Sequence, residues 1–425
     1  MTGFVAFDLW DVATQKGRNA RFLKLALLCD WAQSEPAKDS LLSTVLPALT
    51  ALPYKAIFAR KNTFFWSALD SCARLLQSDA LSADAEERLA PLLFDAFFEH
   101  LPIGFALRLR ADGRQAISLP ELKVRTEGRV DRIEKSSPDI LLLRGDKHEA
   151  VEIADPLPHF QLRTRSIKGR AESALLLDAT PNLFSPSYGH LAISRLEEAP
   201  AAELEGAIGD ALTFLDVLDA QFAARIGTTI NWYIPVKSND SQMHISFSVP
   251  RLTGVIFLSQ PTPEMGVPGW LKIGEVLVHE FAHNELNLYQ ESKPVFKDDP
   301  ERLFYSPWRP DPRPLNGLFH GIYSFWHVAE FFRCSLQSGE LKGFDASAEE
   351  SYRHTLWQLR IALWQIPPEL LTLEGRAIIE VIANNVSATF DNNDLCDSVV
   401  DAKMQAHIAQ WRTRNPVYAD GIRLT

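Results

Sequence analysis

The sequence predicts an α+β fold, because helical and strand-like patterns occupy different parts of the chain. Apolar residues recur every three or four positions up to about residue 101 and again beyond residue 268, which is typical of amphipathic helices. Between these parts, short β-prone segments alternate with turn residues. The 425 residues exceed the usual size of one domain. We therefore predict a helical N-terminal region at 1–117, a β-rich middle region at 118–260 and a helical C-terminal region at 261–425.

The N-terminal region is predicted to be helical over residues 18–101. The segment Arg21–Trp31 is amphipathic, and Ala80–His100 repeats apolar positions at helical spacing. Three prolines interrupt this pattern, each suited to the first turn or the break of a helix: Pro47, Pro53 and Pro91. We expect several helices separated near these prolines.

The middle region is predicted to begin with a meander or a pair of hairpins. Its first four strands are separated by turn sequences: Leu122–Arg125, Arg129–Ile133, Ile140–Arg144 and Ala150–Ile153. Residues 155–170 contain two prolines and several basic residues, so we predict a loop there. A helix at Pro200–Ala223 and three further strands follow: Thr229–Ile234, His244–Val249 and Thr253–Ser259.

The C-terminal region is predicted to be mainly helical. Five of its segments have helical periodicity: Trp270–Tyr289, Gly317–Leu336, Glu349–Trp364, Leu373–Thr389 and Leu395–Arg412. A stretch rich in proline and arginine, residues 294–314, separates the first two.

Composition and charge limit the classes of function. The formal net charge of -11 argues against binding to nucleic acid or to an anionic membrane surface. The N-terminus lacks the pattern of a signal peptide, and no apolar run approaches the roughly 20 residues that span a bilayer. The cysteines are far apart and indicate single thiols in a reducing compartment: Cys29, Cys72, Cys334 and Cys396. We therefore expect a soluble, cytoplasmic protein.

A metal site is predicted from His279, Glu280 and His283, which form the pattern His-Glu-x-x-His. Residues four apart lie on one face of a helix, so the two imidazoles can converge on one cation. The flanking residues are apolar, which indicates a buried helix, and buried histidines need partners. Glu280 would contact metal-bound water or support a ligand. The alternative is a surface helix with two unrelated histidines.

His320 is the best candidate for a third ligand. It lies near the start of the next predicted helix, between Gly317 and Gly321, where a backbone can approach closely. His327 is seven residues further, roughly 10 Å along the same helix, so the two cannot share one ion. Glu330 is the alternative that a peptidase with two histidines and one glutamate would use. Two further alternatives for the third ligand are the carboxylate of Glu280 and the absence of any third side chain.

Spacing alone would indicate a zinc metallopeptidase in which Glu280 is the general base. Two features disagree with it. The position two after His283 is Glu285, where such peptidases keep an apolar residue. Moreover, Arg309 and Arg313 stand among prolines that stiffen the backbone, and arginines bind carboxylates in a bidentate manner. A dicarboxylate cosubstrate would need such a partner. The alternative for both arginines is an exposed pair bracketing Asp311.

The joint pattern resembles a known family. His279-Glu-x-x-His283, Pro307-Trp-Arg309-x-x-x-Arg313-Pro314 and His320-Gly-x-x-x-Phe325 are similar to motifs of the HExxH-type peptide β-hydroxylases, which depend on iron(II) and 2-oxoglutarate. The match covers about residues 276–330. These enzymes act on ribosomally made precursor peptides in natural-product pathways.

The resemblance implies iron(II) bound by His279, His283 and His320. It also implies that Arg313 or Arg309 binds 2-oxoglutarate, and that molecular oxygen and a precursor peptide are the other reactants. Zinc metallopeptidase remains the alternative. For the peptide, the residues suggest Thr253–Ser259 as an exposed edge strand, although an interior strand fits its apolar residues equally well. The sequence gives neither the leader-peptide site nor the oligomeric state.

Overall fold

The computed structural model describes residues 83–422, with gaps at 102, 110–116, 121, 127–129, 146–147, 154–161, 169, 171–172, 178–195, 238–243, 251, 262–266, 292, 298–301, 342 and 393–397. The predicted helices before residue 83, with Pro47 and Pro53, lie outside the described residues. The same is true of three cysteines: Cys29, Cys72 and Cys396. Cys334 is a buried free thiol.

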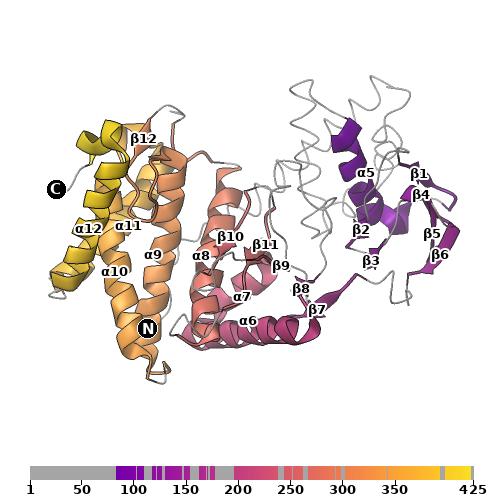
Figure 1. Ribbon diagram of the computed structural model, residues 1–425, viewed down its shortest axis with the longest axis horizontal. Helices are drawn as coiled ribbons and strands as arrows, with labels where there is room; N and C mark the ends of the chain where they lie inside the picture. The colour runs from indigo at the N-terminus through magenta and orange to yellow at the C-terminus, as the bar shows by residue number, and fades with distance from the viewer. Residues whose placement is uncertain are drawn as a thin grey trace. The chain divides into compact units, whose positions relative to one another are not determined.

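The described chain has an α+β architecture and divides into two compact units (Figure 1). One unit, which we call the helical unit, contains Gly206–Thr229 and Pro261–Thr425. The other, the β unit, contains the described residues up to Glu205 together with Ile230–Gln260. Each unit is assembled from separate stretches of sequence, so the units do not correspond one to one with the three predicted regions.

The β unit begins with a helix and an antiparallel meander. Helix α5 (Ala83–Phe97) continues through Pro91, the ninth of its 15 residues, so the first turn or break predicted at that proline was wrong. The apolar face of α5 packs on the first sheet. The order of that sheet is β1-β4-β5-β6. Its strands are β1 (Ala106–Arg108), β4 (Val130–Lys135), β5 (Ile140–Gly145) and β6 (His148–Glu152). A separate hairpin joins β2 (Ser118–Leu119) to β3 (Val124–Arg125). Three of the four predicted strands form the meander β4-β5-β6, whereas the predicted strand Leu122–Arg125 belongs to the separate hairpin. Strands β1 and β2 were not predicted.

The second sheet of the β unit is mixed, with the order β10-β11-β9-β8-β7. Its strands are β7 (Thr164–Ser166), β8 (Ala174–Leu176), β9 (Trp232–Pro235), β10 (Ser246–Phe247) and β11 (Val255–Leu258). Strand β7 lies in the stretch predicted to be a loop, and that prediction was wrong there. Strand β11 pairs with β10 on one side and with β9 on the other. It is therefore an interior strand, as its four buried residues indicate, and not the exposed edge suggested for the peptide.

The segment predicted as one helix at Pro200–Ala223 forms two helices, α6 (Glu198–Leu218) and α7 (Ala220–Thr229). Asp219 stands between them. Its carboxylate accepts hydrogen bonds from the backbone N–H groups of Gln221 and Phe222, which caps α7. An aspartate in that position competes with the continuous helix, so the apolar periodicity alone missed the break.

The helical unit contains five more long helices among the described residues. These are α8 (Gly269–Gln290), α9 (Leu315–Ser338), α10 (Asp345–Gln365), α11 (Leu373–Asn392) and α12 (Ser398–Arg414). Helix α9 packs against both α8 and α10 (Figure 1). It ends at Gly339, whose φ of 71° places it in the left-handed conformation typical of a helix C-terminus. No described helix is long and apolar enough to cross a membrane.

The stretch rich in proline and arginine forms a short hairpin before α9. Strand β12 (Leu303–Phe304) pairs with β13 (Arg313–Pro314), in the register Phe304 with Arg313. Helix α9 starts directly after β13, at Leu315. The hairpin thereby fixes the backbone of Arg313 at the N-terminus of the helix that bears His320.

Candidate metal centre

Helices α8 and α9 form the framework of the predicted metal site. Side-chain contacts bring Gly274 next to Phe331, His279 next to Phe325 and His283 next to His320. The residue numbers rise along α8 as they fall along α9, so the two helices are antiparallel. The residues that flank the two histidines of α8 are buried: Val276, Leu277, Val278, Phe281 and Ala282. The predicted buried helix is confirmed, and burial of this face keeps both imidazoles pointing toward α9.

The structure brings the three predicted ligands together. Nε2 of His279 lies 3.1 Å from Nε2 of His283, and Nδ1 of His283 lies 3.2 Å from Nδ1 of His320. Two nitrogens bound to one ion at about 2.0–2.1 Å lie about 2.9–3.4 Å apart, depending on the coordination geometry. The Nε2 atoms of His279 and His283 therefore have the spacing that a shared cation requires.

The ring nitrogens of His320 are not directed at the position between the Nε2 atoms of His279 and His283. His283 uses one ring nitrogen toward His279 and the other toward His320, so the three rings form a chain. Accordingly, no group of three or more His, Cys, Asp or Glu side chains among the described residues has its donor atoms arranged to hold a metal. The donor set suits a first-row metal, but His320 would join it only after its ring, or that of His283, turns about the Cβ–Cγ bond.

Burial lowers the pKa of all three imidazoles. The pKa of His283 falls to about 4 through burial, and that of His320 to about 3 through burial and the nearby His283. The pKa of His279 falls well below its ordinary value, chiefly through burial and then through His283. The three rings are therefore neutral at pH 7, which is the form that binds metals.

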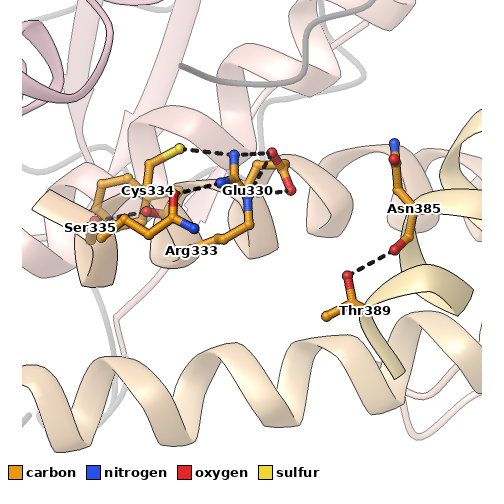
Figure 2. A network of polar contacts seen from close by, with 8 residues as sticks. Glu330, Arg333, Cys334, Ser335, Asn385 and Thr389 are labelled. Atoms are coloured by element: carbon orange, nitrogen blue, oxygen red, sulfur yellow. Dashed lines mark hydrogen bonds and ion pairs between the residues drawn. The ribbon is translucent and has the colours of Figure 1, made fainter. Parts of the chain in front are cut away.

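The two glutamates considered as ligands have different surroundings. Glu280 is 1% exposed and lies within α8 beside His279. Glu330 is held by Arg333, whose Nη2 lies 2.8 Å from its Oε2 and whose Nε lies 3.1 Å from its Oε1. Figure 2 shows this guanidinium between the Glu330 carboxylate and Sγ of Cys334, all on α9. Glu330 is also ten residues beyond His320, roughly 15 Å along the helix. Glu330 is therefore paired with Arg333, about 15 Å along the helix from His320.

Both predicted cosubstrate arginines face Asp311. Nη1 of Arg313 donates to Oδ2 of Asp311 at 3.2 Å, and Nε of Arg309 lies 4.0 Å from Oδ1 of Asp311. The Arg309 side chain is 57% exposed and that of Arg313 is 34% exposed. The guanidinium of Arg313 also lies against the first turn of α9, because a Cβ at Gly317 would meet its Nε at 3.2 Å. Gly317 is three residues before His320, so the Arg313 guanidinium lies against the helical turn that precedes this histidine.

Trp308 contacts both Gly321 and Phe325, the two residues that follow His320 in the motif. Its indole lies directly on Gly321, where an added Cβ would come within 2.8 Å of the ring. It stacks on Phe325, with ring centroids 4.6 Å apart and an interplanar angle of 1°. Phe325 in turn meets the ring of His279 edge-on, with centroids 4.7 Å apart. The motif residues are therefore in contact with one another and with a predicted ligand.

Sequence reasoning missed a buried polar network on the same helix pair. Glu285, which is 0% exposed, accepts a hydrogen bond of 2.7 Å from the hydroxyl of Tyr323. Nη1 of Arg225, on α7, lies 3.6 Å from Oε1 of Glu285. Nδ1 of His327 lies 2.9 Å from the carbonyl oxygen of Tyr323, and its Nε2 faces Glu285 at 3.8 Å. The only signal in the sequence was the unexpected glutamate at position 285.

No protein-family model matches the chain, and no curated protein matches its sequence. Function is therefore inferred from the site itself.

Proposed function

We propose that this protein is an oxygenase that depends on iron(II) and 2-oxoglutarate and hydroxylates a β-carbon of a ribosomally made precursor peptide. One observation carries the proposal. His279 and His283 present ring nitrogens 3.1 Å apart with His320 in contact, and the Arg313 guanidinium lies against Gly317, three residues before His320. A neutral imidazole cluster beside a guanidinium suits a metal and an anionic cosubstrate together.

The histidines would supply the metal ligands. His279 and His283 would hold the ion through their Nε2 atoms, and His320 would complete the set after a ring rotation. The resulting triad of nitrogens differs from the common arrangement of two histidines and one carboxylate. When bound, iron(II) with 2-oxoglutarate supplies the oxidising chemistry for which molecular oxygen is the other reactant. All three histidines keep some exposed surface, and in this proposal the peptide and oxygen would approach the cluster from that side.

Arg313 would bind the distal carboxylate of 2-oxoglutarate. Pro312 and Pro314 restrict the backbone on both sides of it, and its pairing in the hairpin fixes its position before α9. The carboxylate of the cosubstrate would replace Asp311 on this guanidinium. That exchange costs little because Asp311 is half exposed and the pair is screened by water. Arg309 is the second candidate and is more exposed.

Anaerobic titration tests the cofactor assignment. A 2-oxo acid that chelates iron(II) gives a weak visible charge-transfer band, which we expect from the full chain with both components present. Arg313→Ala should raise the 2-oxoglutarate concentration needed for half of the band by at least about tenfold, since it removes a charge-assisted contact. Arg302→Ala is the matched control, because Arg302 is an exposed arginine of the same hairpin region and pairs with Glu369. Absence of the band, with tight zinc binding instead, would contradict the proposal.

Co-expression with candidate precursor peptides tests the reaction. We expect a peptide that gains one oxygen atom on a β-carbon and keeps its length, detected by tandem mass spectrometry. Glu280→Gln separates this reaction from the zinc metallopeptidase alternative, in which Glu280 is the base. A peptidase would yield shorter products and would lose that activity in the variant while retaining its metal.

A further inference from the structure

The aromatic pair Trp308 and Phe325 stands beside the histidine cluster and has no role in the proposed chemistry so far. We infer that Trp308 is a positioning residue of the metal centre, which fixes the orientation of the His279 imidazole through Phe325. This inference depends on the metal site that we propose for His279.

Trp308 is fixed on three sides. Its indole N–H donates to Oε1 of Gln358, on α10, at 3.0 Å. The Gln358 amide in turn donates to the carbonyl oxygen of Pro307 at 3.3 Å, so the glutamine holds both the ring and the backbone before it. The six-membered ring of the indole lies against α9 at Gly321. These contacts restrict Trp308 to one position, and Trp308 in turn restricts the side chains that pack against it.

Phe325 transmits this position to His279. Its ring is parallel to the indole at an interplanar angle of 1°, and it meets the imidazole at 70°. It lies five residues after His320 on α9, whereas His279 belongs to α8. The edge-to-face contact restricts rotation of the imidazole about its Cβ–Cγ bond. The Nε2 of His279 is thereby directed toward His283, where the ion would bind.

Gly321 allows Trp308 to be displaced without altering any aromatic ring. In Gly321→Ala the new Cβ would lie 2.8 Å from the indole, so the indole must move. In the double variant with Trp308→Ala the obstacle is gone, and the alanine should cost nothing further. Gly206→Ala is the matched control, because a Cβ at this helical glycine meets nothing within 4 Å.

Two measurements on the full-length protein test the inference. The first is titration with cobalt(II), followed by its visible absorption. We expect Trp308→Ala and Gly321→Ala each to weaken binding by about 10–100-fold, as other residues that orient metal ligands do. Trp308→Phe, which keeps the stacking surface, should remain within about threefold of the unaltered protein, and the double variant should match Trp308→Ala. Gly206→Ala should bind as the unaltered protein does.

The second measurement needs no metal. With histidine labelled at Cε1, the resonance of His279 should shift in metal-free Trp308→Ala and Gly321→Ala, because the neighbouring ring moves, and should stay in place in Gly206→Ala. An unchanged His279 resonance, or equal cobalt(II) affinity in all variants, would overturn the inference. If the unaltered protein binds no divalent metal, the proposed function fails. A shifted His279 resonance in the two variants would then still support the role of Trp308 in orienting the ring.

Discussion

The helix pair α8–α9 contains two groups of polar side chains with opposite character, one of three histidines and one built around a single histidine. In the first group, His279, His283 and His320 contact mainly one another and are partly exposed. In the second, His327 lies in a fully buried network with Glu285 and Tyr323. In the first group the ring nitrogens face one another, and this arrangement is the basis for the metal site that we propose. In the second group His327 contacts the Tyr323 carbonyl and Glu285 accepts from the Tyr323 hydroxyl, so we infer a structural role.

The second group also accounts for the residue that disagrees with a zinc peptidase. Glu285 joins three helices, because Arg225 belongs to α7, Glu285 to α8 and Tyr323 to α9. Phe222 and Phe281 close the network from the side of α7 with an edge-to-face contact. A charge buried in this way is tolerated only when it is paired. The network therefore links α8 and α9, the two helices that carry the proposed metal ligands.

Removing the cation of the network should have the largest effect. Arg225→Leu takes away the guanidinium that faces the Glu285 carboxylate and should lower the free energy of unfolding by about 3–5 kcal/mol. Denaturant unfolding of the metal-free protein measures it. Arg302→Leu is the control, since Arg302 forms an exposed pair with Glu369 at 3.8 Å and should cost at most about 1 kcal/mol. Equal losses in the two variants would contradict the structural role of the network.

Acid should destabilise the fold through His327. Burial is the main cause that lowers its pKa from 6.5 to about 4, while the hydrogen bond to Tyr323 opposes this and Arg225 adds to it. The unfolded chain therefore binds a proton at higher pH than the folded chain does. The free energy of unfolding should fall as the pH drops from 6.5 to about 4, by about 3 kcal/mol for this group.

The variant His327→Gln isolates that contribution. It retains a side-chain donor for the Tyr323 carbonyl but cannot take up the proton. Over the same pH range, the free energy of unfolding should fall by about 3 kcal/mol less in this variant than in the unaltered protein. The other histidines contribute equally to both proteins, so the difference reports His327 alone. Parallel curves for the two proteins would show that His327 does not remain neutral in the fold.

The two groups should also respond differently to loss of a histidine. His320→Ala should weaken cobalt(II) binding by roughly 100-fold or more, beyond the 10–100-fold typical of residues that only orient ligands. Its stability should change little, because His320 is partly exposed and neutral. His327→Ala should do the reverse and lower stability while leaving metal affinity within about tenfold. If both variants lost metal equally, the two groups would not be functionally distinct.

The difference between the groups also shows what the sequence alone could predict. The spacing of His279 and His283 follows from helical geometry, so their common face was predictable, and His320 could be chosen by its position near a helix start. The network of Arg225, Glu285 and Tyr323 could not be predicted from the sequence. Its members come from three helices, and no local pattern encodes how these helices pack. The same applies to β11: its apolar residues fit an edge or an interior strand, and only pairing with β9 and β10 decides.

The smallest effect should come from Asp311, the exposed counterpart of Glu285. Both carboxylates face an arginine, but the side chain of Asp311 is 52% exposed and the side chain of Glu285 only 1%. Asp311→Asn should change the free energy of unfolding by less than about 1 kcal/mol. It should nevertheless tighten binding of 2-oxoglutarate by about two- to fivefold in the anaerobic titration, because the cosubstrate no longer competes for Arg313. In Arg313→Ala the same substitution should have no effect on affinity. Weaker binding in Asp311→Asn would mean that Asp311 holds Arg313 in place for the cosubstrate, and that the exposed pair, like the buried one, is structural.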